Sequence, residues 1–401
     1  MVVLCISASS IFWAPFLREV YYIPMQDAMN LSNTQMGMLM GVFGGVGLLT
    51  YFPGGWLADR VSPRKLITLS LIATGISGLY FSTFPGYIAS LLLHAFWGVS
   101  ITLVFWGALI KATRGWAPAA EQGRAFGILE TGRGLNDVFS ATAFLALFIW
   151  LGSGKSALST VIVCFSLFNI GLGVATWFLI EDSENNSPSD TKIVGVQDVL
   201  TVLKMPVVWL ISVVILCAYS AYWGSFFFTP YASDVFLMSV TMGAALSVGR
   251  MWLRPVAALA AGFLGDRFGI SKTVAVSMAI TAVCFALFAM TPATPAILPL
   301  VILNVAISAS FIFAMRAIYF ALLEEGGIPL RLTGTAAGIA SVIGFTPDVY
   351  MPVVGGLLLD AYPGMTGYRL LFGFVAVLAV IGFFAALMII RLQKPKQELI
   401  S

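Results

Sequence analysis

The sequence predicts an all-α membrane protein whose twelve transmembrane helices form two pseudo-symmetric six-helix bundles. Three observations indicate this fold class. Of the 401 residues, 59% are hydrophobic and only 10% are charged, whereas about a quarter of the residues of a soluble domain are charged. Apolar segments of spanning length recur along the chain, separated by short polar or Gly/Pro-rich turns. A short loop motif also occurs twice, once in each half.

Six apolar segments precede a central polar stretch and six follow it. The first six cover about 1–29, 33–56, 65–84, 86–113, 122–151 and 156–180. The last six cover about 206–233, 238–264, 271–291, 295–323, 333–360 and 367–391. The polar stretch EDSENNSPSDTK has the composition of a flexible linker, and the following VQDVLTVLKM is a short amphipathic segment that could lie on the membrane surface. We expect an N-terminal bundle at 1–181, a cytoplasmic linker at 182–204 and a C-terminal bundle at 205–401.

The distribution of lysine and arginine predicts the orientation, because cytoplasmic loops of membrane proteins carry an excess of both. With the amino terminus inside, only Lys155 and Arg369 fall on the outer face. The cytoplasmic set is Arg60, Arg64, Lys65, Arg114, Arg124, Arg267, Lys272, Arg331, Arg391, Lys394 and Lys396. We therefore predict a multi-pass protein of the inner membrane with both termini in the cytoplasm.

Several function classes are disfavoured by composition. A formal charge of +3 is too small to suggest a nucleic-acid partner. The four cysteines lie in apolar runs without metal-ligand spacing, so they are interpreted as buried thiols. The chain has a single histidine, His94, which is too few for a histidine-rich metal site and disfavours a catalytic triad. No nucleotide-binding loop or nucleophile motif occurs in the sequence. We expect neither an enzyme nor a cofactor.

The duplicated motif lies between segments two and three and again between segments eight and nine. It reads GGWLADRVSPRK from Gly54 to Lys65 and AGFLGDRFGISK from Ala261 to Lys272. In each copy a glycine permits close approach of two helices, an aspartate can cap or pair at a helix end, and basic residues hold the inner membrane face. Its recurrence in both halves is typical of a secondary transporter built from repeats.

These two loops resemble the loop signature of the major facilitator superfamily, although Ser62 and Pro63 depart from its glycine pattern. The resemblance implies two six-helix bundles around a central cavity, which rock to expose a midplane site to each side in turn. It also implies that residues of both loops latch one of those states. The predicted latch residues are Gly55, Asp59, Arg60, Arg64, Gly262, Asp266 and Arg267.

Charged residues inside the predicted spans are the main functional signal, because intramembrane charges are costly and mark substrate or ion paths. Glu130, Arg133 and Asp137 are spaced to share one helical face. Arg250 and Arg254 are one turn apart, so they require a carboxylate or an anionic ligand nearby. Other readings stay open: Arg316 and Asp348 could form a structural bridge, Lys111 could snorkel, and Glu19 could be the local partner of Arg18.

A closer resemblance concerns the first segment. FLREVYYIP at 16–24, DAMNLSNTQMG, the loop FWGALIKATRGWAPAAEQGRAFG and LTGTAAGIASVIG are similar to the organophosphate:phosphate antiporter branch. The resemblance implies that Arg18 holds an anionic substrate group. The branch has a second phosphate-binding arginine in helix seven, but this chain has Tyr222 or Trp223 at that position. At the position of the branch's helix-five histidine, this chain has Arg133. A positive pocket built from Arg18, Arg133 and Arg250 would accept carboxylate, sulfonate or phosphate.

We therefore predict a monomeric secondary active transporter that moves a small organic anion by alternating access, either proton-coupled or by exchange. The anion would be a sugar acid, carboxylate, sulfonate or phosphate ester. The predicted proton-coupling residues are Glu130, Asp137 and Asp348. The predicted substrate-binding residues are Arg18, Tyr22, Arg133, Tyr222, Trp223, Arg250, Arg254 and Arg316.

Two alternatives remain from the sequence. Proton-driven efflux of amphipathic or drug-like compounds would use the aromatic residues and sixteen methionines as an adaptable cavity. Export of a hydrophobic cation that requires Glu130 or Asp348 but not Arg18 would favour efflux. A sensor that binds a ligand without transport, or a membrane enzyme, forms the second alternative. A chain that binds its ligand yet never moves it across vesicles would favour the sensor.

Overall fold

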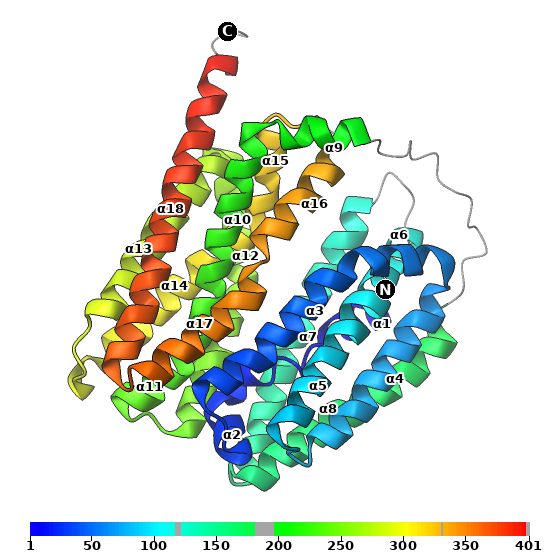
Figure 1. Ribbon diagram of the computed structural model, residues 1–401, viewed down its shortest axis with the longest axis vertical. Helices are drawn as coiled ribbons and strands as arrows, with labels where there is room; N and C mark the ends of the chain where they lie inside the picture. Colours follow the sequence, from blue (N-terminus) through cyan, green and yellow to red (C-terminus); the bar gives the residue numbers. More distant parts are fainter. Residues whose placement is uncertain (117–121, 181–195, 330–331, 398–401) are drawn as a thin grey trace. The chain divides into compact units, whose positions relative to one another are not determined.

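The computed structural model describes residues 1–116, 122–180, 196–329 and 332–397, and these residues are almost entirely helical (Figure 1). They divide into two compact units. Unit 1 comprises residues 1–186 and 238–249, and unit 2 comprises residues 187–237 and 250–401. The predicted bundle boundaries at 181/182 and 204/205 stay predictions.

Unit 1 is built from long helices that pack in pairs distant in sequence. Helix α4 packs along α8, α3 packs on α5 and on a π-helix, and α1 packs on α7 (Figure 1). The helices are α1 (Val2–Ser10), α2 (Arg18–Met29), α3 (Asn33–Arg60), α4 (Pro63–Phe81), α5 (Tyr87–Gly98), the π-helix (Val99–Trp106), α6 (Gly107–Trp116), α7 (Gln122–Trp150) and α8 (Lys155–Leu179).

Unit 2 packs α18 against both α13 and α10, and α10 also contacts α14, α16 and α17 (Figure 1). Helix α12 (Val240–Phe268) contributes its residues from Arg250 onward to this unit. The other helices are α9 (Val196–Leu203), α10 (Pro206–Gly224), α11 (Phe228–Phe236), α13 (Ile270–Met290), α14 (Leu298–Ile318), α15 (Leu322–Glu325), α16 (Thr333–Gly344), α17 (Pro347–Ala361) and α18 (Met365–Gln397).

Among the residues that the structure describes, seven helical stretches are both long and apolar enough to cross a membrane: Tyr87–Thr113, Lys155–Leu179, Pro206–Phe236, Ile270–Met290, Pro295–Glu325, Thr335–Ala361 and Met365–Leu392. Each of the twelve predicted segments falls on helical structure. Helix α12 lies outside the seven, and its charged residues Arg250, Arg254, Asp266 and Arg267 lower its mean hydropathy. That all twelve segments cross the membrane stays a prediction.

The first predicted segment is not one continuous helix. Helix α1 ends at Ser10, residues 11–17 form successive turns, and α2 begins at Arg18. The turns after the break still bond the end of α1, because the backbone N–H of Trp13 donates to the Ser10 carbonyl oxygen at 3.1 Å. Asn169 of α8 donates a further hydrogen bond from Nδ2 to the same oxygen at 3.1 Å. Within α2, Tyr21 has non-helical backbone angles three residues before Pro24.

Three spans of unit 2 are also interrupted. A short 3-10 turn at Ser225–Phe227 joins α10 to α11, and another at Tyr319–Ala321 joins α14 to α15. Helix α16 ends at Gly344, and α17 starts at Pro347, where the fixed backbone angle and missing N–H of proline suit the first turn of a helix. These interruptions lie next to the charged and aromatic residues described below.

The histidine and most of the cysteines are buried packing residues. His94 is buried, its Nδ1 lies 2.8 Å from the Ser90 carbonyl oxygen, and its ring packs edge-on against Trp97. All four cysteines are free thiols, and only Cys164 is not fully buried.

Candidate functional site

Unit 2 brings Tyr222, Arg316 and Asp348 into one polar and aromatic cluster. The guanidinium carbon of Arg316 lies 3.7 Å from the centre of the Tyr222 ring and 5.3 Å from that of Tyr219. Trp223 donates from Nε1 to Oδ1 of Asp348 at 2.7 Å. The Asp348 carboxylate also interacts electrostatically with Arg316. The structure places Arg316 and Asp348 in the same cluster, and a bridge between them stays a prediction.

The interruptions of the helices place these side chains. Tyr222 and Trp223 occupy the last turn of α10, directly before the 3-10 turn, and Arg316 lies in the last turn of α14. Asp348 lies in the first turn of α17, where the positive end of the helix dipole favours a carboxylate. Discontinuous spans that end near the middle of a transporter are typical of substrate and ion sites.

Arg250 belongs to the same cluster. It is 3% exposed, and its Nη1 donates to Oγ of Ser225 at 2.6 Å. Its guanidinium carbon lies 5.5 Å from the Phe226 ring centre and 5.9 Å from that of Phe313. Both phenylalanines also contact Tyr222, so aromatic rings connect Arg250 to Arg316. Arg254 lies one helical turn further along α12 and is half-buried.

Arg133 forms a second centre, in unit 1. Its guanidinium carbon lies 5.3 Å from the Phe12 ring centre and 5.6 Å from that of Trp106. Its Nη1 forms an ion pair with Oε1 of Glu130 at 3.3 Å. The Arg133 side chain is 20% exposed and that of Glu130 is 53% exposed. Trp106 is the last residue of the π-helix, a form of helix that frequently marks functional sites.

Asp137 is held by the first helix. Oγ of Ser9 in α1 donates to Oδ1 of Asp137 at 2.5 Å, and the same hydroxyl accepts from Nδ2 of Asn136 at 2.9 Å. The predicted stripe of Glu130, Arg133 and Asp137 therefore has two kinds of surroundings. Arg133 and Glu130 pair with each other, whereas Asp137 joins α7 to α1.

Arg18 and Tyr22 form a third group, at the start of α2. Arg18 is 2% exposed, donates from Nη1 to the Met36 carbonyl oxygen at 2.9 Å, and lies 4.9 Å from the Tyr22 ring centre. The Tyr22 hydroxyl donates to Oδ1 of Asn33 at 2.9 Å. These contacts fasten the start of α2 to the start of α3. Arg18 is thus deeply enclosed within unit 1.

The predicted latch loops lie at helix ends, and their arginines contact aromatic rings. Arg60 lies 3.9 Å from the Trp56 ring centre, and Arg64 lies 4.8 Å from that of Trp177. The Asp59 side chain lies outside the described part of the structure. In the second copy Asp266 is exposed, and Arg267 lies 5.4 Å from the ring centre of Phe268.

In the first copy of the motif, the glycine at which a neighbouring helix comes close is Gly54. A Cβ on Gly55 or Gly262 would meet no described atom within 4 Å. A Cβ on Gly54 would lie 2.5 Å from the Thr102 carbonyl oxygen of the π-helix. One residue rotates a helical side chain by about 100°, so neighbouring glycines face different surroundings.

Several contributing residues were missed from the sequence. Ser9, Ser225 and Phe313 act through tertiary contacts with charged residues, and nothing in their sequence context distinguishes them from packing residues. Glu325 at the end of α15 accepts from the backbone N–H of Ser271 at 2.5 Å and from its hydroxyl at 2.6 Å. The Glu325 carboxylate lies at the start of α13, where the helix dipole favours a negative charge. Its hydrogen bonds to Ser271 also hold the second loop motif against the end of α15.

The comparisons with known proteins agree with this architecture. The family model described as "Major Facilitator Superfamily" matches residues 3–347. The chain belongs to the major facilitator superfamily. Its family membership confirms the prediction from the duplicated loop, whereas the organophosphate:phosphate antiporter branch stays a prediction.

Individual relatives show how far the similarity extends. Inner membrane protein YihN of Escherichia coli is 31% identical over 409 residues, which cover 99% of this chain and 96% of the relative. A probable sulfoacetate transporter, SauU of Cupriavidus necator, is 33% identical over 119 residues, covering 29% of this chain and 25% of the relative. The crystal structure of a bacterial homologue of the human lysosomal transporter Spinster has a TM-score of 0.78 at 16% identity, with 97% of this chain and 96% of that chain covered.

The family and the seven spans make this chain a multi-pass membrane protein of a transporter superfamily. The likeness to the Spinster homologue concerns the fold alone.

Proposed function

We propose that this protein is an inner-membrane secondary transporter that moves a small organic anion by alternating access. The main support is that Nε of Arg133 and Nε of Arg316 are buried and make no hydrogen bond within the described part of the chain. Buried donors without an acceptor are rare in native proteins and call for an explanation. An anionic ligand would supply the missing acceptors.

The chemistry of arginine favours an oxyanion as that ligand. A guanidinium group presents Nε and one Nη side by side, in a geometry that matches two oxygens of a carboxylate, sulfonate or phosphate. Aromatic faces beside Arg133 and Arg316 stabilise the cation without cancelling its charge. The short match to a relative described as a probable sulfoacetate transporter is consistent with this substrate class.

Within this proposal, Arg133 and Arg316 are the principal anion ligands. The more deeply buried Arg18 and Arg250 support them, and Arg254 adds positive charge along α12. Tyr22, Tyr222 and Trp223 shape the surroundings of these arginines. Asp348 is the proposed proton-coupling group, because its carboxylate is linked both to Arg316 and to Trp223. Glu130 and Asp137 are second choices, since Glu130 is exposed and Asp137 is bound to Ser9.

The test is a transport panel with purified protein in proteoliposomes, offering sugar acids, carboxylates, sulfonates and phosphate esters alongside neutral sugars and hydrophobic cations. We expect transport of an anion. Arg133→Gln and Arg316→Gln should each weaken its binding about 10- to 100-fold, since one charge-assisted hydrogen bond contributes about 1.5–3 kcal/mol.

Arg369→Gln is the matched control, because this arginine is exposed at the start of α18 and should leave binding unchanged. Export of a hydrophobic cation that tolerates Arg133→Gln and Arg316→Gln would overturn the proposal and establish efflux instead.

A further inference from the structure

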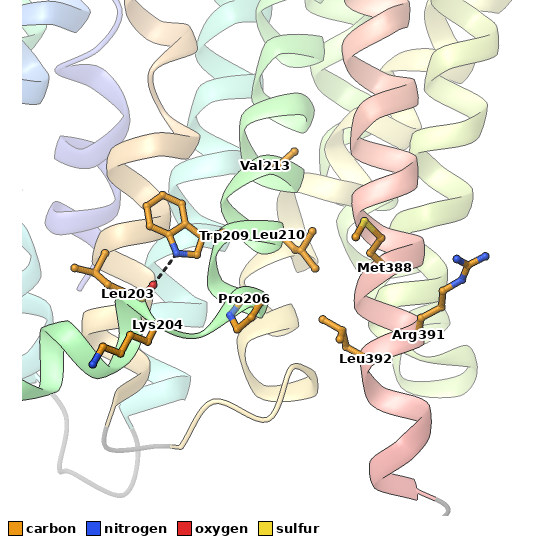
Figure 2. A pocket seen from close by; sticks show the side chains of 9 residues that line it. All are labelled: Leu203, Lys204, Pro206, Trp209, Leu210, Val213, Met388, Arg391 and Leu392. Atoms are coloured by element: carbon orange, nitrogen blue, oxygen red, sulfur yellow. Dashed lines mark hydrogen bonds between the residues drawn. The ribbon is translucent and has the colours of Figure 1, made fainter.

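A groove outside the arginine clusters opens on unit 2 at the junction of α9, α10 and α18 (Figure 2). Its volume is about 620 Å³. The end of α9 and the start of α10 form one wall, and the end of α18 forms the other. The lining residues are Leu203, Lys204, Pro206, Trp209, Leu210, Val213, Met388, Arg391 and Leu392.

Two spans independently locate this groove at a membrane boundary. The span that contains α10 begins at Pro206, and the span of α18 ends at Leu392. Residues from both of these ends line the groove. Trp209 is 47% exposed, and its Nε1 donates to the Leu203 carbonyl oxygen at 2.8 Å. A tryptophan with an apolar ring and a satisfied N–H is typical of the interface between hydrocarbon and headgroups.

The groove has an apolar floor and walls and basic residues at its rim. Its floor and walls are apolar, and Leu210 on α10 points toward Met388 on α18 (Figure 2). Its charged members are Lys204 and Arg391, both exposed, and none of the described residues that line the groove is a carboxylate. The two basic side chains lie on opposite rims with their charged ends away from the apolar floor (Figure 2).

We propose that this groove binds an anionic glycerophospholipid. One acyl chain occupies the apolar trough along Leu210, Val213 and Met388, and the phosphate group lies at the rim, where the positive charges of Lys204 and Arg391 attract it. The apolar floor alone would accept any lipid. Two cations without a lining carboxylate select a negatively charged headgroup, because each basic residue near the membrane surface attracts anionic lipid. This site is separate from the residues that the transport proposal uses.

The proposal is tested by native mass spectrometry of the delipidated full chain, titrated with phosphatidylglycerol or phosphatidylcholine carrying identical acyl chains. We expect phosphatidylglycerol to be retained about fivefold more strongly for each rim cation. The double variant Lys204→Gln/Arg391→Gln should bind both lipids equally. Arg369→Gln, at the other end of α18, is the matched control and should keep the preference.

A groove-filling variant separates this site from general attraction of lipid to a charged surface. Leu210→Trp should reduce retention of phosphatidylglycerol by at least about fivefold while leaving both rim cations in place. Full retention in Leu210→Trp would overturn the proposal, as would equal binding of the two lipids by the unmodified chain. A dimer that excludes lipid would overturn it too, because a second copy would then be the occupant.

Discussion

At the scale of single residues, the arginines are held in a way that the sequence does not show. A sequence reading seeks a carboxylate beside each intramembrane arginine. In the structure Arg133, Arg250 and Arg316 lie beside aromatic rings, and Arg133 is also paired with Glu130. An aromatic face stabilises a cation through its quadrupole and leaves the net charge in place. The aromatic rings therefore do not neutralise these arginines.

Asp348→Asn is predicted to uncouple transport from the proton gradient. The amide keeps the size of the carboxyl group but permanently lacks the negative charge that acts on Arg316. We expect proton-driven accumulation in proteoliposomes to be lost. Exchange of labelled for unlabelled substrate should persist, because it needs no net proton movement.

Asp137→Asn is the comparison variant for Asp348→Asn. Because Ser9 binds Asp137, its replacement should lower thermal stability more than it alters coupling. Undiminished proton-driven accumulation in Asp348→Asn would exclude Asp348 as the coupling group.

At the scale of helices, irregular segments coincide with the functional candidates. Residues 11–17 precede Arg18, the π-helix ends at Trp106, and short 3-10 turns follow Trp223 and Arg316. Non-helical backbone at membrane depth is tolerated only where it is buried in protein or lines a water-filled cavity. We therefore expect the surrounding helices to enclose each of these segments.

Gly54→Ala is predicted to destabilise unit 1, since the new methyl group would meet the Thr102 carbonyl oxygen at 2.5 Å and backbone cannot move aside cheaply. The expected cost is about 1–3 kcal/mol. Gly45→Ala on the same helix meets nothing described within 4 Å and is the control. Thermal unfolding in detergent measures both. Equal melting temperatures for the two variants would contradict the close packing of α3 against the π-helix.

At the scale of the whole molecule, the distribution of lysine and arginine predicts the topology. Single cysteines placed at Lys155 or Arg369 should react with a membrane-impermeant maleimide added outside intact spheroplasts. A cysteine at Lys272 should react only after permeabilisation. Cys164 is replaced by serine beforehand, because it is the one native cysteine that is not fully buried. External labelling at Lys272 would reverse the predicted orientation.

The sequence by itself determined the helical membrane class, the twelve apolar segments and the duplicated loop, and the last of these led to the correct superfamily. These features are local, since hydropathy and motif spacing are written along the chain. The sequence also selected Arg133, Arg316 and Asp348, because intramembrane charge is conspicuous in an apolar background.

Only the tertiary structure decided which of these charges act together. It placed Arg316, Tyr222 and Asp348 in one cluster, fixed Asp137 to Ser9, enclosed Arg18 and made Gly54 the glycine of close approach. Such pairings depend on the rotation of each helix about its axis and on where each helix is interrupted. Rotation and interruption follow from packing between distant segments, so no local pattern of residues specifies them.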